Sequence, residues 1–465
     1  MSEQPSSRRD FLRNVSALST LTALGACRGR SLVSGRRRKG LRLATFRCDV
    51  TPPLGTPIYS SYKPLEKVEH PLLAKGMILE SGGSRYVLCA VDWCELSNST
   101  HELFRRRIAE VARIDPSHVA VQTVHQHTAP MAGGDAAQLV ESVDNPPPHP
   151  SVASFDEGAE RIAAAVSESL ETFVPFDHIG VGQAKVERVA SSRRIPIGDG
   201  KVGFRASSCK DPDVCAMPEG MIDPYVKTIT LSQADQPLVR LHYYATHPQS
   251  FYGDPRASYD FPGIARQRLQ AKENVFQIYF TGCAGDVAAG KYNDGTPPVR
   301  AQLAQRLLAG MEASIASTKY TPVDTLSWRN HSVVFAARDD SGYTESDCRA
   351  KMADTSLSPN HRFTAAQTLS WRMRTERPIE LSALQLGDVH ILHLPGEPMI
   401  TYQLFAQRLR RDRIVAVAGY GDCGTGYICT EHAFPEGGYE PTASNIVPES
   451  ELLLRDAIRH LLDVA

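Results

Sequence analysis

One stretch decides how this chain is interpreted: Val119-Ala120-Val121-Gln122-Thr123-Val124-His125-Gln126-His127-Thr128-Ala129-Pro130. An apolar, β-branched run ends there in two histidines separated by one residue, and a loop of small residues and proline follows at once. Alternate residues of a strand share one face, so His125 and His127 are expected to point the same way. Strand ends are also where α/β proteins place their chemistry. The competing interpretation is a pair of solvated loop histidines.

The segment before this stretch predicts a βαβ unit. Residues 86–91 form a continuous apolar run, typical of a strand buried on both faces, and the run ends at Asp92-Trp93-Cys94-Glu95. Ser99 and Glu102 form a capping box, which predicts the start of a helix with an apolar face of Phe104, Ile108, Val111 and Ala112. Strand, helix and strand at this spacing form a crossover, so we expect the two strands to be parallel.

The same pattern of an apolar strand ending in a turn with glycine or proline recurs along the chain. A first strand spans residues 41–50 and runs into Pro52 and Pro53, which cannot continue a ladder of hydrogen bonds. Later strands are predicted at residues 238–245, 275–280, 389–394 and 414–418, and helices at residues 155–170, 399–409 and 449–462. We therefore expect an α/β fold with a layered sheet core flanked by helices.

Two longer segments lack this pattern. Residues 187–227 are rich in Gly, Ser, Arg and Cys and predict a long irregular loop, and long loops inside compact domains are usually functional. Residues 318–377 are more polar and predict amphipathic helices. The sequence contains no visible internal repeat and no domain boundary after residue 40. Residues 41–465 are accordingly predicted to form one catalytic domain.

Composition limits the possible partners. The 465 residues carry a formal net charge of -1, so the chain lacks the basic field that nucleic acid requires. We expect a small-molecule or lipid substrate and identify no protein partner. The ten cysteines include no C-x-x-C pair, which argues against a cysteine zinc site. Cys209 with Cys215, and Cys423 with Cys429, could each close a small disulfide or remain unpaired.

Residues 1–27 predict an export signal. Ser7-Arg8-Arg9-Asp10-Phe11-Leu12 precedes a short run of apolar and small residues, the arrangement of a twin-arginine signal. Leu24-Gly25-Ala26-Cys27 resembles a bacterial lipoprotein cleavage box with Cys27 as the lipidated residue, and residues 28–40 then form a flexible basic linker near lipid headgroups. The expected location is the periplasm, with the protein either anchored to a membrane or released. The alternative is a disordered basic tail.

Polar residues gather at the predicted strand ends, namely His125, His127, His247, Asp286, Glu397 and, slightly later, Tyr427. A core histidine with one hydrogen bond is the ordinary interpretation of any single one. Two imidazoles and one carboxylate, however, form the His2Glu set of a catalytic zinc with an open position for water. Zinc lowers the pKa of such a water and polarises a carbonyl group. Spacing does not distinguish zinc from manganese or iron, so the hypothesis is metal-assisted hydrolysis.

Six short motifs in order resemble the neutral/alkaline, non-lysosomal ceramidase family over nearly all of residues 41–445. They are Asp49-Val50-Thr51-Pro52-Pro53-Leu54-Gly55, Thr123-Val124-His125-Gln126-His127-Thr128-Ala129-Pro130, Ala245-Thr246-His247-Pro248, Gly285-Asp286-Val287, Pro395-Gly396-Glu397 and Gly426-Tyr427-Ile428-Cys429-Thr430. The resemblance implies two central sheets flanked by helices. It also implies one zinc per chain and hydrolysis of the amide bond of N-acylsphingosine.

The resemblance further assigns roles to individual residues. It implies that zinc is bound by His125, His247, Glu397 and Tyr427. His127 would assist proton transfer or polarise the carbonyl. Tyr439, in Gly437-Gly438-Tyr439-Glu440, matches a second tyrosine of the family site, and Arg193 matches its arginine, with Arg194 as the alternative register.

Two departures from the family pattern put the substrate in question. Ala288 stands where the family usually has a serine, so a role of that hydroxyl has no counterpart. The sequence ends at residue 465, and we expect the family's C-terminal immunoglobulin-like domain to be missing. The alternatives to a ceramidase-like amidase are a zinc hydrolase of the same fold that acts on an ester or a non-sphingolipid N-acyl compound, and a catalytically inactive, surface-anchored binding protein.

Overall fold

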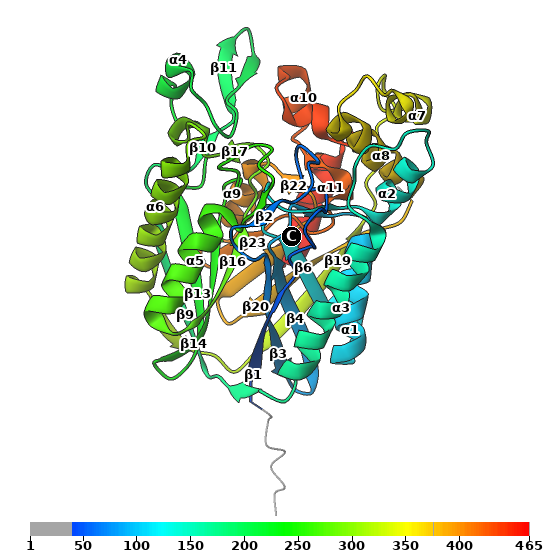
Figure 1. The fold of residues 1–465 in the computed structure, drawn as a ribbon. Helices are drawn as coiled ribbons and strands as arrows, with labels where there is room; N and C mark the ends of the chain where they lie inside the picture. The colour runs from blue at the N-terminus through cyan, green and yellow to red at the C-terminus, as the bar shows by residue number, and fades with distance from the viewer. Residues whose placement is uncertain (1–39, 375, 465) are drawn as a thin grey trace, which may run out of the picture. The chain divides into compact units, whose positions relative to one another are not determined.

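Three larger sheets, each covered by helices, organise residues 40–374 and 376–464, which the computed structural model describes (Figure 1). The predicted signal, its cleavage box at Cys27 and all but the last residue of the predicted linker lie outside the described residues. The prediction of a layered α/β fold is confirmed. The expectation of two central sheets is wrong, because the sequence after residue 318 contributes a third sheet of four strands.

The first sheet has the strand order β6-β4-β3-β1-β8. Its strands are β1 Arg42–Asp49, β3 Leu73–Ser81, β4 Ser84–Val91, β6 Val119–Thr123 and β8 Val174–Pro175. Strands β4 and β6 are parallel and are joined by helix α1, Ser99–Ala112, so the predicted βαβ crossover is confirmed. Helices α1 and α3, Val152–Ser169, cover one face of the sheet (Figure 1).

The second sheet has the order β16-β14-β13-β9-β18. Its strands are β9 His178–Lys185, β13 Tyr225–Gln233, β14 Gln236–Tyr244, β16 Phe276–Thr281 and β18 Lys319–Pro322. Helix α5, Asp260–Glu273, joins the parallel strands β14 and β16, and helix α6, Pro297–Ala316, packs beside it on the same sheet.

The third sheet has the order β19-β20-β21-β23. Its strands are β19 Leu326–Val333, β20 Ile379–Leu386, β21 Val389–His393 and β23 Ile414–Ala418. Helix α9, Ile400–Leu409, joins the parallel strands β21 and β23, and helix α11, Ser450–Leu461, packs against β19 and β20.

The three sheets repeat one topology that the sequence did not reveal. In each, three antiparallel strands are followed by a helix, a strand parallel to the third and a second helix. We call these the first, second and third repeats. Hydrogen bonds join the ends of their parallel edge strands: Thr281 Oγ1 donates to Val124 O (2.8 Å), Gly419 N to Thr281 O (2.9 Å), and Thr123 N to Tyr420 O (2.8 Å). The loops after these strands therefore meet at one place.

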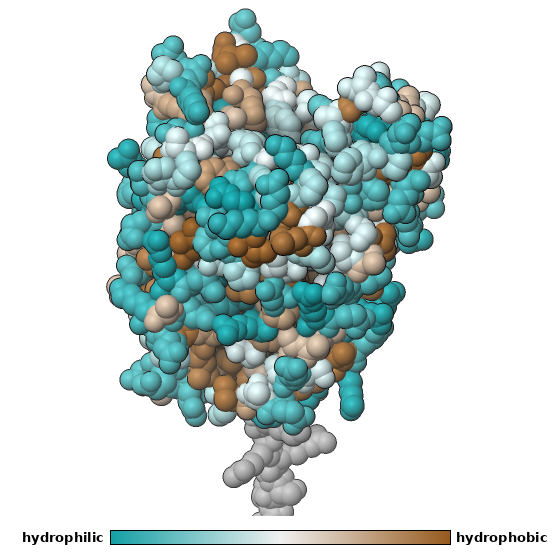
Figure 2. All heavy atoms as spheres, in the orientation of Figure 1, coloured by the Kyte–Doolittle hydropathy of each residue, from teal (hydrophilic) through white to brown (hydrophobic). Residues whose placement is uncertain are grey.

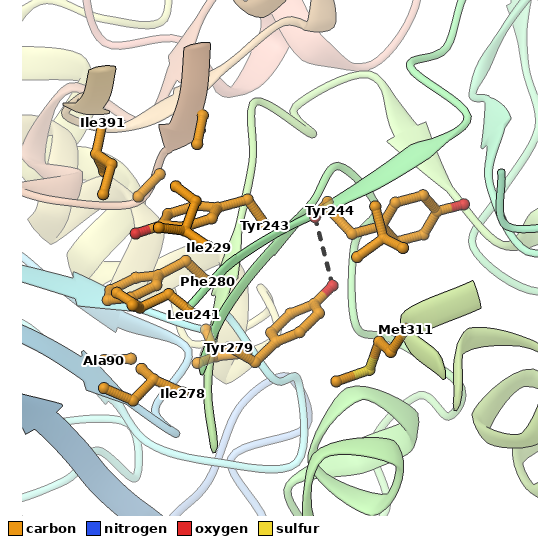
Figure 3. Close-up of a cluster of buried hydrophobic side chains, with 14 of the residues drawn as sticks. Ala90, Ile229, Leu241, Tyr243, Tyr244, Ile278, Tyr279, Phe280, Met311 and Ile391 are labelled. Carbon is orange, nitrogen blue, oxygen red and sulfur yellow. Dashed lines mark hydrogen bonds between the residues drawn. The ribbon is translucent and has the colours of Figure 1, made fainter. Parts of the chain in front are cut away.

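A shared hydrophobic core holds the three sheets together (Figure 3). Ala90 of the first sheet, Ile229 and Ile278 of the second, and Ile391 of the third belong to one cluster of buried side chains. Phe280 also belongs to it and stacks on Tyr243 with the ring centroids 5.1 Å apart. Burial of apolar surface between sheets is the main favourable term in assembling such a fold.

Short elements connect the repeats. The strands among them are β2 Lys67–Val68, β5 Glu95–Leu96, β7 Met131–Ala132, β10 Ser191–Ser192, β11 Arg194–Gly198, β12 Lys201–Phe204, β15 Arg256–Ala257, β17 Val287–Ala288, β22 Glu397–Pro398 and β24 Tyr427–Ile428. The helices are α2 Gly134–Glu141, α4 Pro212–Ala216, α7 Glu345–Ala353, α8 Pro359–Arg374 and α10 Ala433–Glu436, with the 3-10 turns η1 Pro116–His118, η2 Gly290–Tyr292, η3 Cys423–Thr425 and η4 Glu440–Ala443.

Two local predictions need correction, and one open alternative is resolved. The capping box at the start of α1 does not form: Asn98 is the N-cap, the Ser99 hydroxyl donates to Asp135 (2.6 Å), and Glu102 pairs with Arg374 (2.9 Å). Residues 187–227 are not simply irregular, because they contain the β11–β12 hairpin, α4 and the start of β13. The nine cysteines of the described chain are all free, so neither suggested disulfide is present.

No helix among the described residues has the length and apolar content needed to cross a membrane.

Candidate metal centre

His125 and His127 lie just beyond the end of β6 rather than within it. His125 adopts a left-handed backbone conformation with φ 71°, so the alternation of a strand does not explain why the two rings meet. The backbone N–H of His125 instead donates to Trp93 O (3.0 Å), and its ring Nδ1 lies 2.8 Å from Cys94 O. The Nε2 atoms of His125 and His127 are 3.2 Å apart.

His247 approaches the same point from the second repeat. It follows β14, its backbone N–H donates to Val287 O (2.9 Å), and its ring Nδ1 lies 2.7 Å from Ala284 O. A carbonyl oxygen only accepts hydrogen bonds, so the Nδ1 atoms of His125 and His247 carry the protons. Both Nε2 atoms consequently present lone pairs to the centre, as metal-ligating histidines do.

Glu397 and Tyr427 come from the third repeat and are held side by side. Short strands β22 and β24 pair in parallel with Glu397 opposite Tyr427. Gly396, with φ 60°, makes this approach possible, because a Cβ there would lie 2.2 Å from Thr425 Oγ1 and 2.7 Å from Gly426 O. The two candidate ligands are therefore fixed by backbone pairing.

Three buried acceptor atoms converge at the centre. The Nε2 atoms of His125 and His247 are 3.2 Å apart, and Glu397 Oε2 lies 3.1 Å and 3.0 Å from them. Glu397 Oε2 makes no hydrogen bond with the described residues, although it is buried. Ligands held at about 2.0–2.1 Å from a tetrahedral ion lie about 3.3 Å apart, so the spacing fits a metal. Three lone pairs facing one point form a group that could hold a metal ion.

A second possible group, Cys94 with His125 and His127, fits a metal less well. Burial raises the pKa of the Cys94 thiol, and the carboxylates of Glu95 and Glu397 raise it further. The thiolate, which is the form that binds metals, is therefore disfavoured. His125 Nδ1 also already faces Cys94 O.

Arg193 lies inside the centre, whereas Arg194 points elsewhere. Arg193 Nη1 donates to the Tyr427 hydroxyl (2.9 Å) and to Gly285 O (3.2 Å), and it lies 3.4 Å from His247 Nε2. Arg194 instead forms ion pairs with Glu436 (2.9 Å) and Glu440 (2.8 Å). Of the two registers, only Arg193 brings its guanidinium to the candidate ligands.

The electrostatic environment of the centre keeps His247 and His127 uncharged. Burial, followed by Arg193, lowers the pKa of His247 to about 4. His127 has a pKa well below its usual value because of burial and then the neighbouring His125 and His247. These histidines are therefore neutral near pH 7.

The phenol of Tyr427 differs from the other candidate ligands. Its hydroxyl oxygen lies 3.4 Å from His247 Nε2, and burial raises the pKa of the phenol well above its ordinary value, although Arg193 lowers it. The protein alone thus keeps this phenol protonated. A bound dication would favour the phenolate, because an adjacent positive charge stabilises the ionised form.

A cavity of about 300 Å³ leads to this centre. Its aromatic lining residues include Phe204, Tyr252 and Tyr439, which are partly exposed at its rim. Tyr439 packs edge-on against Tyr427 with ring centroids 5.6 Å apart and lies over the Arg193 guanidinium at 5.1 Å. The β11–β12 hairpin beside it carries exposed Ile197, and brown, hydrophobic atoms gather on this hairpin at the top of Figure 2.

Asp286, which sequence reasoning grouped with the candidate ligands, has a different position. Its Oδ1 accepts from the backbone N–H of Ile400 (2.7 Å) at the start of α9, and its backbone oxygen accepts from Arg193 N (2.8 Å). Burial raises the pKa of Asp286 to about 6. Asp286 thus positions Arg193 and α9. Ala288 is buried in β17, paired with Ser191 of β10.

Three residues near the centre were missed by sequence reasoning. Tyr420 stacks on His125 with ring centroids 4.3 Å apart, and the ring of Tyr59 lies 4.9 Å from that of His127. Glu95 lines the cavity beside Glu397. Glu95 and Tyr420 both follow apolar strands, so the strand-end pattern that identified the other residues could have found them. Tyr59 lies in a loop and carried no such signal.

The fold and the site together define a mixed α/β protein with a buried His2Glu cluster where three repeats meet. The chain matches no protein family and none of the curated proteins with which it was compared. Among solved structures it is similar to neutral ceramidase from Pseudomonas aeruginosa, with a TM-score of 0.68 and 14% identity over 91% of this chain and 75% of that chain. A ceramidase complexed with C2 is similar at a TM-score of 0.67 and 14% identity, over 91% of this chain and 76% of that one. The chain has a neutral ceramidase-like fold, as its motifs predicted.

Proposed function

We propose that this protein is a zinc-dependent hydrolase that cleaves a linear amide of an N-acyl substrate. The observation that carries the proposal is the convergence of His125 Nε2, His247 Nε2 and Glu397 Oε2 within 3.2 Å of one another at the base of a cavity. The solved structures that share the fold are described as ceramidases, which supports amide cleavage. His125, His247 and Glu397 would hold the zinc, and Tyr427 would be a fourth ligand.

Zinc bound at this site would polarise the amide carbonyl and provide an activated water as nucleophile. The remaining chemistry belongs to the side chains around it. The guanidinium of Arg193 stays charged, because its neighbours Tyr427 and Glu440 raise its pKa more than burial lowers it. Arg193 and the hydroxyl of Tyr439 would stabilise the negative charge that develops on the carbonyl oxygen.

His127 is the candidate for proton transfer. It is buried, its Nε2 faces His125, and its Nδ1 has no hydrogen-bond partner in the described residues. Because its pKa is low, the ring is neutral at the start and can take the proton from the attacking water. When the carbon–nitrogen bond breaks, the same proton passes to the departing nitrogen, which leaves as the amine.

The deciding experiment measures metal content and hydrolysis together. We expect about one zinc per chain by elemental analysis, and cleavage of a fluorogenic N-acyl substrate, first an N-acylsphingosine. His125→Ala/His247→Ala should lose both. The exposed His361→Ala is the matched control and should lose neither. A wild-type chain that binds no metal under loading conditions would overturn the proposal.

The same assays separate the alternative functions. Zinc without cleavage of N-acylsphingosine, but with cleavage of other amides or esters, would identify a hydrolase of another specificity. The buried Ala288, which offers no hydroxyl, favours a substrate range different from that of a serine-containing site. Zinc without turnover of any acyl substrate would identify a binding protein.

We also propose export through the twin-arginine signal and anchoring through lipidated Cys27, which are supported by the motifs in residues 7–12 and 24–27. Mass spectrometry of the protein from a bacterial host should find a lipidated N-terminal Cys27. Arg8→Lys/Arg9→Lys should retain the unprocessed chain in the cytoplasm. An N-terminus at Met1 in the wild type would contradict the proposal.

A further inference from the structure

Glu95 is a buried carboxylate at the wall of the candidate site that the proposed reaction does not use. It follows β4, the strand of the first repeat that corresponds to β14 and β21, whose following loops carry His247 and Glu397. The backbone of Glu95 is fixed by the pairing of β5 with β7, and the residue is 6% exposed. The repeat thus delivers a third polar residue to the same place.

Glu95 lacks the basic partner that several other buried carboxylates of the described chain possess. Asp92 pairs with Arg266 (2.7 Å) and Asp223 with Lys227 (2.8 Å). Within residues 40–374 and 376–464, no basic side chain lies within 4.0 Å of Glu95, and its side chain accepts one hydrogen bond, from Gln367 Nε2 (3.3 Å). A buried carboxylate without a counter-charge is costly, so the fold leaves this position prepared for an external cation.

The surroundings of Glu95 form a small polar chamber beside the metal centre. This lobe has a volume of about 60 Å³ and shares Glu95, Glu397 and Tyr427 with the main cavity. Its other lining includes the polar side chains of Thr364, Gln367, Thr368 and Asn445. A cavity of about 10–15 Å³ on the same measure holds one water molecule, so the chamber has room for a few waters or for a small charged group.

We propose that Glu95 binds an ammonium group carried close to the scissile amide of the substrate. This inference rests on the proposed amidase function and specifies its substrate class as N-acyl compounds with a second, positively charged nitrogen. An ammonium in this chamber would pair with the Glu95 carboxylate while the neighbouring amide lies at the metal centre. A long hydrocarbon chain on the same side would leave Glu95 buried and unpaired.

The test compares substrates that differ only at this group. Mono-N-acyl diaminoalkanes and aminoacyl alkylamides of increasing chain length are each paired with the compound that has a hydroxyl in place of the ammonium. We expect kcat/KM to favour the best ammonium substrate by at least about 10-fold, and Glu95→Gln to lower this ratio by about 10- to 100-fold. Glu168→Gln, an exposed glutamate of α3, is the control and should leave the ratio unchanged.

Two outcomes overturn the inference without touching the proposed function. One is amide cleavage with equal kcat/KM for ammonium and hydroxyl substrates. The other is a preference for ammonium that survives Glu95→Gln.

If no amide is cleaved, the proposed function fails, and calorimetry still tests whether Glu95 binds an ammonium group. Zinc-loaded wild type should then bind N-acetyl-1,2-diaminoethane more tightly than N-acetylethanolamine, and Glu95→Gln should abolish the difference. Equal binding of the two compounds by the wild type would contradict the inference.

Discussion

At the scale of single residues, the candidate metal centre depends on the backbone contacts that orient its side chains. His125, His247 and Glu397 were selected because each follows an apolar strand, and the structure places them together. Their convergence depends on features that no strand pattern predicts. These include the positive φ of His125 and the two carbonyl oxygens that orient the imidazole rings. The choice between Arg193 and Arg194 likewise required the positions of Glu436 and Glu440.

Adjacent arginines allow a matched test at this scale. Arg193→Met removes the cation that contacts the Tyr427 hydroxyl at 2.9 Å, so kcat for amide hydrolysis should fall by about 10²–10³-fold while zinc content is retained. Arg194→Met removes two ion pairs outside the centre and should mainly lower the melting temperature. Steady-state kinetics and thermal unfolding of both variants check this. Equal losses of kcat in the two variants would contradict the role given to Arg193.

At the scale of elements, most strands and helices were predictable because their apolar periodicity is strong. The strands at residues 238–245, 275–280 and 414–418 match β14, β16 and β23 within a few residues. Elements stabilised by tertiary contacts were missed. The side chains of strand β19 are mostly of intermediate exposure, and its sequence is polar. Its pairing with β20 and its packing against α11 could not be inferred from that sequence alone.

Lys75 in the middle of β3 gives a pH-dependent prediction for the first sheet. It is fully buried, its Nζ donates to Gln270 (2.5 Å), and burial followed by the charge of Arg266 lowers its pKa from 10.5 to about 6. The unfolded chain keeps this proton up to a higher pH than the folded chain. The contribution of Lys75 to stability therefore increases as pH rises from about 6 toward 10.5.

Replacing Lys75 with methionine should remove this dependence. Lys75→Met should be more stable than the wild type at pH 7, with the difference shrinking as pH rises, because the variant has no proton to lose on folding. A gain of about 1 kcal/mol corresponds to roughly 2 °C in melting temperature for a large domain. Calorimetric unfolding of both proteins from pH 6 to about 10 tests this. A constant difference across that range would exclude titration of Lys75 as the cause.

The hydrogen bonds between edge strands predict a coupling between elements and the site. Thr281 Oγ1 donates to Val124 O just before His125, so Thr281→Val leaves that buried carbonyl unpaired and releases the histidine loop. Zinc affinity should fall by about 10-fold, because groups that orient metal ligands typically contribute this much. Thr281→Ser keeps the hydroxyl and should restore most of the affinity. Competition with a chromogenic chelator measures both variants, and equal weakening in the two would contradict the hydrogen-bond explanation.

At the scale of the whole molecule, the sequence concealed a threefold recurrence of one topology. The repeats share the order of strands and helices but no visible sequence pattern, because buried strands and amphipathic helices tolerate many apolar combinations. The recurrence explains why site residues so distant in sequence meet, because two loops of each repeat open toward the same centre. His247 and Glu397 follow the third strands of their repeats, whereas His125 follows the parallel edge strand of the first repeat. Their contacts with one another, rather than each unit alone, should then determine stability.

The ion pair between Asp92 and Arg266 tests this dependence, because it joins the first repeat to helix α5 of the second. Both side chains have 0% exposure, and two hydrogen bonds of 2.9 Å and 2.7 Å link them. Asp92→Asn leaves a buried guanidinium without its counter-charge, so the free energy of unfolding should fall by about 3–5 kcal/mol. Removing the unpaired charge of Arg266 as well, in Asp92→Asn/Arg266→Met, should recover a large part of that loss.

If the repeats depend on one another, denaturant unfolding of each variant will remain a single transition shifted to a lower denaturant concentration. Separate transitions would indicate that the repeats unfold independently. A double variant that is less stable than Asp92→Asn would contradict the explanation by an unpaired buried charge.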